Sequence, residues 1–315
     1  MCEIQDVFNI GDVAPKALIP LSETEIIKSW YDSRPIVSIL CGTYEHSKYI
    51  SNAIDGMVAQ RTSFPFEIII RDDGSNDGTA DIVKEYSEKY PRIIRPILEK
   101  CNNYPKEKSI FVMREKAQGK YFAYCEGDDY WIDPNKLEKQ VSLLEENLNL
   151  VSVTSAQIDI EDGFIVDIKY NRGGTRTLLH KGNIDIPSHR QEFIYFGDTY
   201  IRAILNNFGD TYCISEPMAV WRKHKGGVFN SLLQKDNKLL QYKRSTTKFW
   251  IGNYFLESGE KDKGINAVCS SVDQLIDANN DINNIIRFRL LKRWLFSIIC
   301  KIISIITSIY KNVSE

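Results

Sequence analysis

The seven cysteines of this sequence form no recognisable pattern. They include no CxxC pair and no spacing of metal ligands, and their number is odd. This excludes a cysteine-based metal domain and argues against a disulfide framework, so we expect a reducing compartment. The first stretch, MCEIQDVFNIGDVAP, lacks a basic segment followed by an apolar run, so no secretory signal peptide is visible. We therefore predict a cytoplasmic protein.

The chain also lacks an excess of charge of either sign. Its 40 Lys and Arg residues nearly balance 42 Asp and Glu residues, which gives a formal net charge of −2. Such a chain has no general field to attract a polyanion, so we expect no nucleic-acid partner. A content of 43% hydrophobic and 26% charged residues excludes wholesale disorder. The length of 315 residues predicts one α/β domain with an extension.

From Pro35 onwards, short apolar runs alternate with amphipathic stretches. The apolar runs are predicted as strands: IVSILCG, FEIIIRD, RIIRPIL and KYFAYCE. The stretches between and after them are predicted as helices: SKYISNAIDGMVAQ, GTADIVKEYSEKY, SIFVMREKAQ and NKLEKQVSLLEEN. This rhythm predicts an α/β fold with a mostly parallel central sheet flanked by helices. Upstream, SETE at Ser22 to Glu25 is a capping box that predicts a short helix.

Beyond residue 150 the periodicity loosens. VSVTSAQIDI and FIVDIKY are predicted as a hairpin, whereas the glycine-rich, basic RGGTRTLLHKGN is predicted as a mobile loop. DTYIRAILNNFG is predicted as a helix capped by Asp198, and a short strand follows around MAVWR. We divide the chain into a lead-in helix (1–34), an α/β domain (35–230, with halves 35–150 and 151–230) and a helical C-terminal region (231–315).

Three polar turns directly follow predicted strands: CGTYEH, RDDGSNDGT and CEGDDYW. The carboxyl ends of parallel strands share one edge of a sheet, where such sheets bind ligands, so we expect these turns to line one polar site. At a strand end, Asp73 could accept a hydrogen bond from a nucleotide base. The alternative is an ordinary turn, for which Asp72, Asp73 and Gly74 supply suitable geometry.

The turn CEGDDYW places Glu126, Asp128 and Asp129 close together. Like charges at this spacing raise one another's pKa unless a cation or a solvated turn compensates them. Mg²⁺ and Mn²⁺ prefer carboxylate oxygens, and Mg²⁺ often shares its ligand shell with substrate phosphates. The pattern therefore fits a cation bound to a diphosphate. The alternative is a solvated acidic turn in which Asp129 or Asp133 caps the next helix.

The three motifs together resemble the nucleotide-binding half of family 2 glycosyltransferases, which have the GT-A (Rossmann-like) fold. The resemblance spans roughly residues 35–146, with weaker agreement to about Gly227. It implies an inverting glycosyltransferase that moves a hexosyl or N-acetylhexosaminyl group from a nucleotide sugar to a hydroxyl of a glycan or lipid-linked acceptor. A UDP-sugar is the donor that we expect. It also implies Mn²⁺ or Mg²⁺ as cofactor and envelope, capsular or O-antigen polysaccharide biosynthesis as the setting.

The resemblance assigns roles to individual residues. The nucleotide sugar would contact Thr43, Tyr44, Glu45, Asp73, Glu126, Gly127 and Asp128. Asp73 would bind the base. Asp128 would bind the metal directly, and Asp129 is the lower-ranked candidate for the same role. The family's metal motif usually begins with Asp, and the longer Glu126 can still reach a ribose or a metal-bound water.

The second half would supply the catalytic base and further phosphate contacts. Asp198 best matches the family's base, a carboxylate at a helix start, although a plain N-cap is the alternative; Glu192 is the reserve. WRKHKGGVFN resembles the family's late basic segment, in which His224 would approach the metal. The adjacent Lys223 and Lys225 would hold phosphates or be solvated. Weaker candidates are His46, His180, His189 and Ser188, of which His180 and Ser188 lie near the expected acceptor.

The chain closes on RFRLLKRWLFSIICKIISIITSIYK. On a helix its polar residues form one narrow stripe: Ser297, Lys301, Ser304, Ser308 and Lys311. A spanning helix needs about 20 apolar residues, and Lys301 would be costly in its middle. The basic flank favours an amphipathic helix, at about 287–311, lying on an anionic membrane surface. The alternative is a helix that packs on the protein itself or on a dimer partner.

Two other functions compete with glycosyl transfer. A nucleotidyltransferase of similar fold would also use acids and Mg²⁺, but it commonly has a glycine- and lysine-rich signature after its first strand, which CGTYEH lacks. A non-catalytic protein that binds sugar nucleotides or glycans would need the pocket without the base. Substitution of Asp128 and Asp198 distinguishes this second alternative from an enzyme.

Overall fold

The structure is a computed structural model that describes residues 8–278, apart from residues 105, 172, 189–190 and 227–236. The chain forms two compact units, Met1–Ser231 and Leu232–Glu315. Two features named above, the amphipathic helix predicted at about 287–311 and the candidate His189, lie outside the described residues.

A nine-stranded sheet forms the centre of the first unit in the described part of the chain. Its strands lie in the order β3-β2-β1-β4-β8-β6-β9-β5, with β7 paired to β6. The four predicted strands are present and parallel: β1 Val37–Thr43, β2 Phe66–Asp72, β3 Ile94–Leu98 and β4 Tyr121–Tyr124. All of β2 is buried, as expected for a strand covered on both faces. The predicted α/β fold is confirmed.

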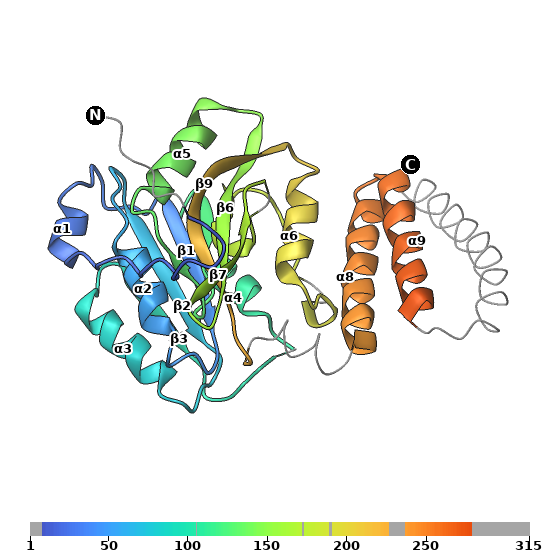
Figure 1. Cartoon of the computed structure of the whole chain (residues 1–315). Helices are drawn as coiled ribbons and strands as arrows, with labels where there is room; N and C mark the ends of the chain where they lie inside the picture. Colours follow the sequence, from blue (N-terminus) through green and yellow to red (C-terminus); the bar gives the residue numbers. More distant parts are fainter. Residues whose placement is uncertain (1–7, 105, 172, 189–190, 227–236, 279–315) are drawn as a thin grey trace. The chain divides into compact units, whose positions relative to one another are not determined.

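Helices cover the parallel strands (Figure 1). The predicted helices are present: α1 Glu23–Ile27, α2 Ile50–Val58, α3 Thr79–Lys89, α4 Ser109–Lys116 and α5 Lys136–Glu146. The capping box of α1 is formed, because the Ser22 hydroxyl accepts a hydrogen bond from the Glu25 N–H and the Glu25 carboxylate accepts one from the Ser22 N–H. Helices α2, α3 and α4 connect the parallel strands β1 to β4, so the polar turns that follow β1, β2 and β4 fall at one edge of the sheet.

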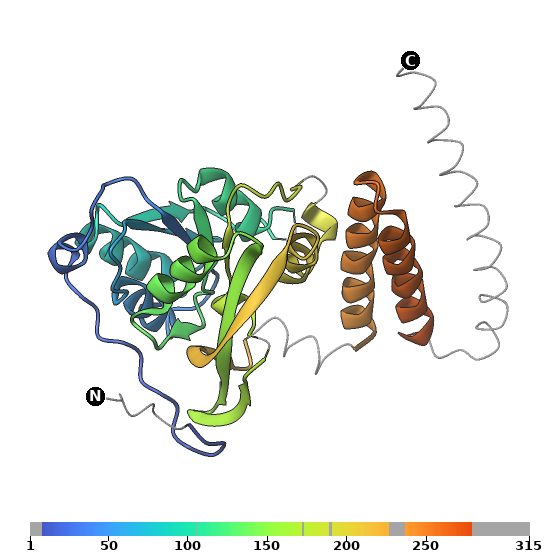
Figure 2. The same cartoon turned by 90° about the horizontal axis from the view of Figure 1, so that it is seen from above.

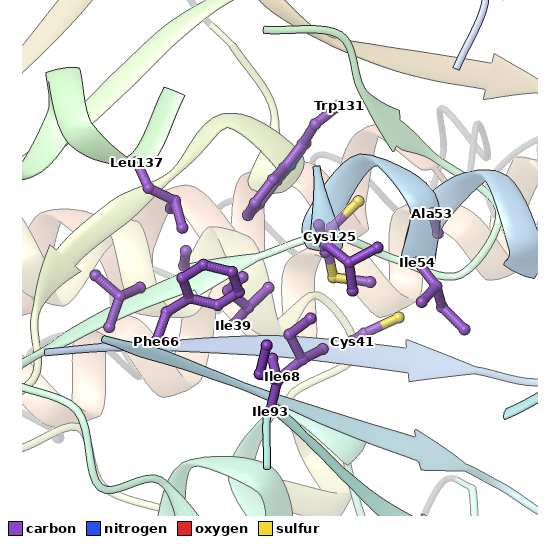
Figure 3. Close-up of a cluster of buried hydrophobic side chains, with 14 of the residues drawn as sticks. Ile39, Cys41, Ala53, Ile54, Phe66, Ile68, Ile93, Cys125, Trp131 and Leu137 are labelled. Atoms are coloured by element: carbon purple, nitrogen blue, oxygen red, sulfur yellow. The ribbon is translucent and has the colours of Figure 1, made fainter. Parts of the chain in front are cut away.

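The main hydrophobic core lies between one face of the sheet and α2, α3 and α5 (Figure 3). Cys41 of β1 points into this core, and because strand side chains alternate, Gly42 faces the other side, where a Cβ would lie 3.2 Å from Ser109 of α4. Trp131 is fully buried, and a Cβ on Gly56 of α2 would lie 2.9 Å from its backbone. Glycine at position 56 therefore lets α2 approach the strand that follows the acidic turn.

The second half of this unit completes the sheet and differs from the prediction in three places. Its elements are β5 Tyr130–Trp131, β6 Leu150–Glu161, β7 Phe164–Lys169, η1 Thr175–Thr177, β8 Leu179–Lys181, η2 Gln191–Phe193, α6 Gly197–Leu205 and β9 Asp210–Lys223. Figure 2 shows the two long strands β6 and β9 side by side, as their parallel pairing requires. The predicted β6–β7 hairpin is present, and the strand around MAVWR is the end of the longer β9.

The prediction of a mobile loop for RGGTRTLLHKGN is wrong. This stretch contains η1 and β8, and β8 is hydrogen-bonded between β4 and β6. Leu179 and His180 are fully buried. The N-cap prediction for Asp198 is also wrong, because Phe196 is the N-cap residue of α6 and Asp198 lies in its first turn without accepting a capping hydrogen bond. The helix ends at Leu205, before the predicted Gly209.

The second unit contains a pair of helices in its described part, α8 Asn237–Glu257 and α9 Lys261–Ala278. This agrees with the helical character predicted for the C-terminal region. The two helices approach closely at glycines, since a Cβ on Gly252 would lie 2.9 Å from the Gly264 carbonyl oxygen, and the reverse distance is the same. No helix among the described residues is long and apolar enough to cross a membrane.

Candidate active site

The three polar turns meet at the carboxyl edge of the parallel strands. The Asp73 N–H donates to the Thr43 carbonyl oxygen at 3.0 Å, and the Gly127 N–H donates to the Gly42 carbonyl oxygen at the same distance. The Glu45 N–H donates to the Ser75 hydroxyl at 2.8 Å. The predicted juxtaposition of CGTYEH, RDDGSNDGT and CEGDDYW is therefore present, and it follows from the parallel order of β2, β1 and β4.

Asp128 is the meeting point of two histidines. Its Oδ2 lies 3.0 Å from Nε2 of His224, at the end of β9, and 3.7 Å from Nε2 of His46, in the first polar turn. The three side chains are mostly buried, and their ligand atoms all lie within 4.8 Å of one another, close enough to hold a metal ion. Sequence reasoning ranked His46 low, although its position in CGTYEH at the same sheet edge was a usable signal.

The ionisation of this cluster suits a cation. Burial alone would raise the pKa of Asp128, but the hydrogen bond with His224 and the charges of His46 and His224 lower it below its ordinary value. Burial lowers the pKa of His46, against the opposing charge of Asp128. An ionised carboxylate beside a neutral imidazole is the state in which both groups bind metals.

Several buried polar atoms beside this cluster lack a protein hydrogen-bond partner among the described residues. They are Glu126 Oε2, Thr43 Oγ1 and His46 Nδ1. Burial also raises the pKa of Glu126, an effect that the charge of Arg176 opposes. Unpaired buried polar atoms are costly, so these positions fit a polar ligand. With the Asp128 cluster, they fit the divalent cation and diphosphate that the family resemblance implies.

Gly127 and Arg222 shape the acidic turn. A Cβ on Gly127 would lie 2.5 Å from Thr43 Oγ1, so only glycine lets the turn pass this close to β1. The Arg222 guanidinium donates to the Asp128 carbonyl oxygen at 2.5 Å and lies against the rings of Tyr49 and Tyr130. Sequence reasoning missed Arg222, whose only signal was its place in WRKHK, two residues before His224.

Asp129 points away from this cluster into the protein. Its Oδ2 accepts a hydrogen bond from Nε of Arg176 at 2.5 Å, and its Oδ1 accepts one from the Arg222 N–H at 2.9 Å. Both carboxylate oxygens therefore have protein partners. Of the two adjacent aspartates, this leaves Asp128 as the candidate metal ligand.

The second polar turn holds Asp73 in a defined orientation. Asp73 is buried, and its Oδ1 lies 3.3 Å from Nη2 of Arg71 and accepts a hydrogen bond from the Asn103 N–H. Arg71 is itself fully buried and pairs with Glu99 and with a second glutamate in the loop before α4. This arrangement leaves Asp73 Oδ2 without a partner among the described residues.

Tyr44 and Glu45 form the rim of the first polar turn. The Tyr44 side chain is 41% exposed, which leaves its ring accessible for stacking. Glu45 adopts a φ of 58°, an unusual backbone conformation for a residue with a side chain, and its Oε1 accepts a hydrogen bond from the Asn76 N–H. The Glu45 carboxylate thus holds the first and second turns together.

Asp198 lies within electrostatic reach of the acidic turn. Its charge contributes to raising the pKa of Glu126. Helix α6 is fixed on α4, because the Tyr200 and Phe111 rings meet edge to face at 6.3 Å and a Cβ on Gly197 would lie 3.2 Å from Ile110. This packing fixes the first turn of α6, which carries Asp198, against α4.

The remaining candidates have different surroundings. Lys223 lies 3.8 Å from Asp159, and Lys225 is exposed. Glu192 belongs to the short helix η2, and Ser188 lines a cavity of about 420 Å³ beside α4. His180 is fully buried between Tyr124 and Arg114, which makes it part of the packed interior.

This geometry agrees with comparisons to known proteins. The family model described as Glycosyl transferase family 2 matches residues 38–203, which is more than half of the chain. The chain belongs to glycosyl transferase family 2. The matched region contains all three polar turns and Asp198.

The chain is also similar to curated proteins and to solved structures. Uncharacterized protein Rv1520 of Mycobacterium tuberculosis is 34% identical over 215 residues, covering 62% of this chain and 61% of the relative, so the chain spans less than two thirds of that relative's length. A Bacillus subtilis protein named provisionally as the teichuronic acid biosynthesis glycosyltransferase TuaG is 33% identical over 42% of this chain and 52% of its own. The structure of S. aureus TarS 1-349 in complex with UDP has a TM-score of 0.51 at 14% identity, covering 78% and 70% of the two chains, which supports the GT-A fold.

Proposed function

We propose that this protein is a metal-dependent, inverting glycosyltransferase that uses a UDP-sugar donor and a glycan or lipid-linked acceptor. The observation that carries the proposal is Asp128, which lies between two histidines at the edge where all three polar turns meet. Beside it, Glu126 Oε2 has no hydrogen-bond partner among the described residues. A cluster of this kind has no evident structural purpose, whereas a cation bound to a diphosphate would satisfy it.

The donor would lie across the first and second polar turns. Asp73 Oδ2 would accept a hydrogen bond from the base, while Arg71 and Asn103 hold the other carboxylate oxygen. Thr43, Tyr44 and Glu45 would line the base and ribose. The choice of UDP is supported by the fold neighbours, because TarS structures have been solved with UDP and with UDP-GlcNAc.

The diphosphate would lie at the acidic turn. Asp128 and His224 would hold the Mn²⁺ or Mg²⁺ ion, with Glu126 and Gly127 beside it. When bound, the ion would compensate the negative charge that grows on the leaving diphosphate as the bond to the sugar breaks. The low pKa of Asp128 keeps this carboxylate ionised for that purpose.

Asp198 would act as the general base. In an inverting transfer, the acceptor hydroxyl attacks the anomeric carbon while a carboxylate takes its proton. Asp198 is half-buried at the start of α6, and its influence on Glu126 supports a position near the sugar. Glu192, in η2 before the same helix, is the reserve candidate.

The acceptor is proposed to belong to a surface polysaccharide. The likeness to TuaG, whose name refers to teichuronic acid biosynthesis, supports envelope, capsular or O-antigen assembly as the setting. Many acceptors of this kind are lipid-linked. A peripheral position on the inner face of the cell membrane, reached through the predicted amphipathic segment at about 287–311, would suit such an acceptor.

The test is donor binding and hydrolysis by the purified protein, with a panel of UDP-, GDP- and dTDP-sugars in Mn²⁺, Mg²⁺ or EDTA. We expect metal-dependent preference for one UDP-sugar. Asp128→Asn should abolish turnover and weaken donor binding. Asp198→Asn should lower turnover at least about 100-fold and leave donor binding unchanged. Normal turnover by either variant would contradict the role given to that residue, and binding of no donor would contradict the transferase.

A further inference from the structure

His46 is oriented towards Asp128 by its own backbone. The His46 N–H donates to the Thr79 hydroxyl at 2.9 Å, and its carbonyl oxygen accepts hydrogen bonds from the N–H groups of Tyr49 and Ile50 at the start of α2. The preceding residue, Glu45, turns the chain with its positive φ. Residues held in such sparsely populated conformations cluster at functional sites, and here the turn delivers the imidazole to the cluster.

We propose that His46, Asp128 and His224 form a two-histidine, one-carboxylate metal site that prefers a first-row transition ion to Mg²⁺. The inference rests on the metal dependence in the proposed function and goes beyond it, because it adds His46 to the ligand set and predicts which ions that set selects. Two ring nitrogens and one carboxylate oxygen already lie within 4.8 Å of one another.

The chemistry of the donor atoms carries the selectivity. Mg²⁺ is a hard cation that takes oxygen ligands and retains its waters, whereas imidazole nitrogen binds transition ions better. For a site with nitrogen ligands, affinity rises from Mn²⁺ to Co²⁺. One histidine would bias an oxygen-rich site only slightly, but two among three protein ligands make the site predominantly nitrogenous. Three protein ligands also leave coordination positions for diphosphate oxygens.

The surroundings of the cluster are built to keep these ligands in place. The Arg222 guanidinium holds the Asp128 backbone by donating a hydrogen bond to the Asp128 carbonyl oxygen. The His224 ring lies 4.7 Å from the Tyr49 ring, and the two histidine rings meet edge to face at 6.2 Å. These contacts hold the Asp128 backbone and the His224 ring in place, as the outer contacts of a metal site do.

The experiment measures metal binding without any sugar nucleotide. The full-length protein is stripped with EDTA, dialysed, and titrated calorimetrically with Co²⁺, Mn²⁺ and Mg²⁺. We expect Co²⁺ to bind at least about 100-fold more tightly than Mg²⁺. His46→Gln keeps the polarity of the side chain and removes the imidazole; it should weaken Co²⁺ binding at least about tenfold and change Mg²⁺ binding by less than about threefold. Tyr49→Phe keeps the neighbouring ring and is the control that should bind both ions normally.

A second measurement needs no variant to fold normally. Electron-spin-echo spectra of the Mn²⁺-loaded wild-type protein should show coupling to nitrogens of two imidazoles. Equal Co²⁺ affinity in wild type and His46→Gln, or equal Co²⁺ and Mg²⁺ affinity in wild type, would overturn the inference and leave a hydrogen-bonded cluster. Nitrogen-selective metal binding without sugar transfer would instead refute the proposed function and keep the metal site.

Discussion

At the scale of single residues, His180 is a buried base with a fixed proton. Its Nδ1 lies 2.7 Å from the Lys181 carbonyl oxygen and therefore carries the hydrogen, while Nε2 accepts from the Tyr124 hydroxyl at 2.8 Å. Burial, reinforced by the charge of Arg114, lowers the pKa of His180 to about 3. The imidazole is thus neutral in the native protein across the physiological range.

This shift predicts a specific loss of stability in acid. An unfolded histidine has a pKa of about 6.5, so between pH 6.5 and pH 3 the unfolded chain binds a proton that the native protein does not. The contribution of His180 to the free energy of unfolding therefore falls as the pH falls, by up to about 1.4 kcal/mol per pH unit. His180→Gln should lose less stability than wild type between pH 7 and pH 5, by about 2 kcal/mol.

Urea titrations of both proteins at the two pH values measure this difference. His180→Gln is expected to be less stable than wild type at pH 7, by about 1–3 kcal/mol, because buried hydrogen bonds are disturbed. Tyr124→Phe removes one of those hydrogen bonds and keeps the imidazole, so it should be destabilised with the pH dependence of wild type. An unchanged pH dependence in His180→Gln would refute the assigned protonation state.

At the scale of elements, the stretch from Gly173 to Lys181 depends on contacts that are distant in sequence. A Cβ on Gly173 would lie 2.1 Å from the Ser155 carbonyl oxygen, so this glycine permits a close approach of two backbones and is not a sign of mobility. Arg176 is held by Asp129 and by the side chain of Gln157. Local composition predicted a loop because none of these partners is visible in a window of a dozen residues.

The Arg176–Asp129 pair predicts a strong effect on stability. Arg176→Met leaves the Asp129 carboxylate buried without its cation, which should cost about 3–5 kcal/mol of unfolding free energy. In the double variant with Asp129→Asn, the uncompensated charge is gone, so part of that loss should return. The midpoints of urea unfolding for wild type, both single variants and the double variant give the coupling energy. Strictly additive losses would mean that the pair does not hold η1 and β8 in the sheet.

At the scale of the whole molecule, the first half of the α/β unit could be predicted from sequence and the second half only in part. In β1 to β4 the apolar runs are continuous and the connections are helical, so alternation alone fixes the order of elements and the edge at which Thr43, Asp73 and Asp128 meet. The ligand cluster depends on β9, which returns from residue 210 to pair with β6. Its register delivers His224 to Asp128, and no local pattern encodes that register.

The C-terminal segment yields a prediction that involves the complete chain. Arg287 and Arg289 belong to the basic flank of the amphipathic segment and lie outside the described residues. Near an anionic membrane each basic residue contributes about 1 kcal/mol, so Arg287→Gln/Arg289→Gln should bind phosphatidylserine-containing vesicles about 30-fold more weakly than wild type.

Lys261→Gln/Lys263→Gln removes the same charge from α9 and is the matched control, expected to bind normally. Cosedimentation at low and at physiological salt measures both, with weaker binding at higher salt. If both variants lose the same amount of binding, net charge alone explains the attraction to the membrane. If Arg287→Gln/Arg289→Gln binds as well as wild type, a membrane contact through this segment is refuted.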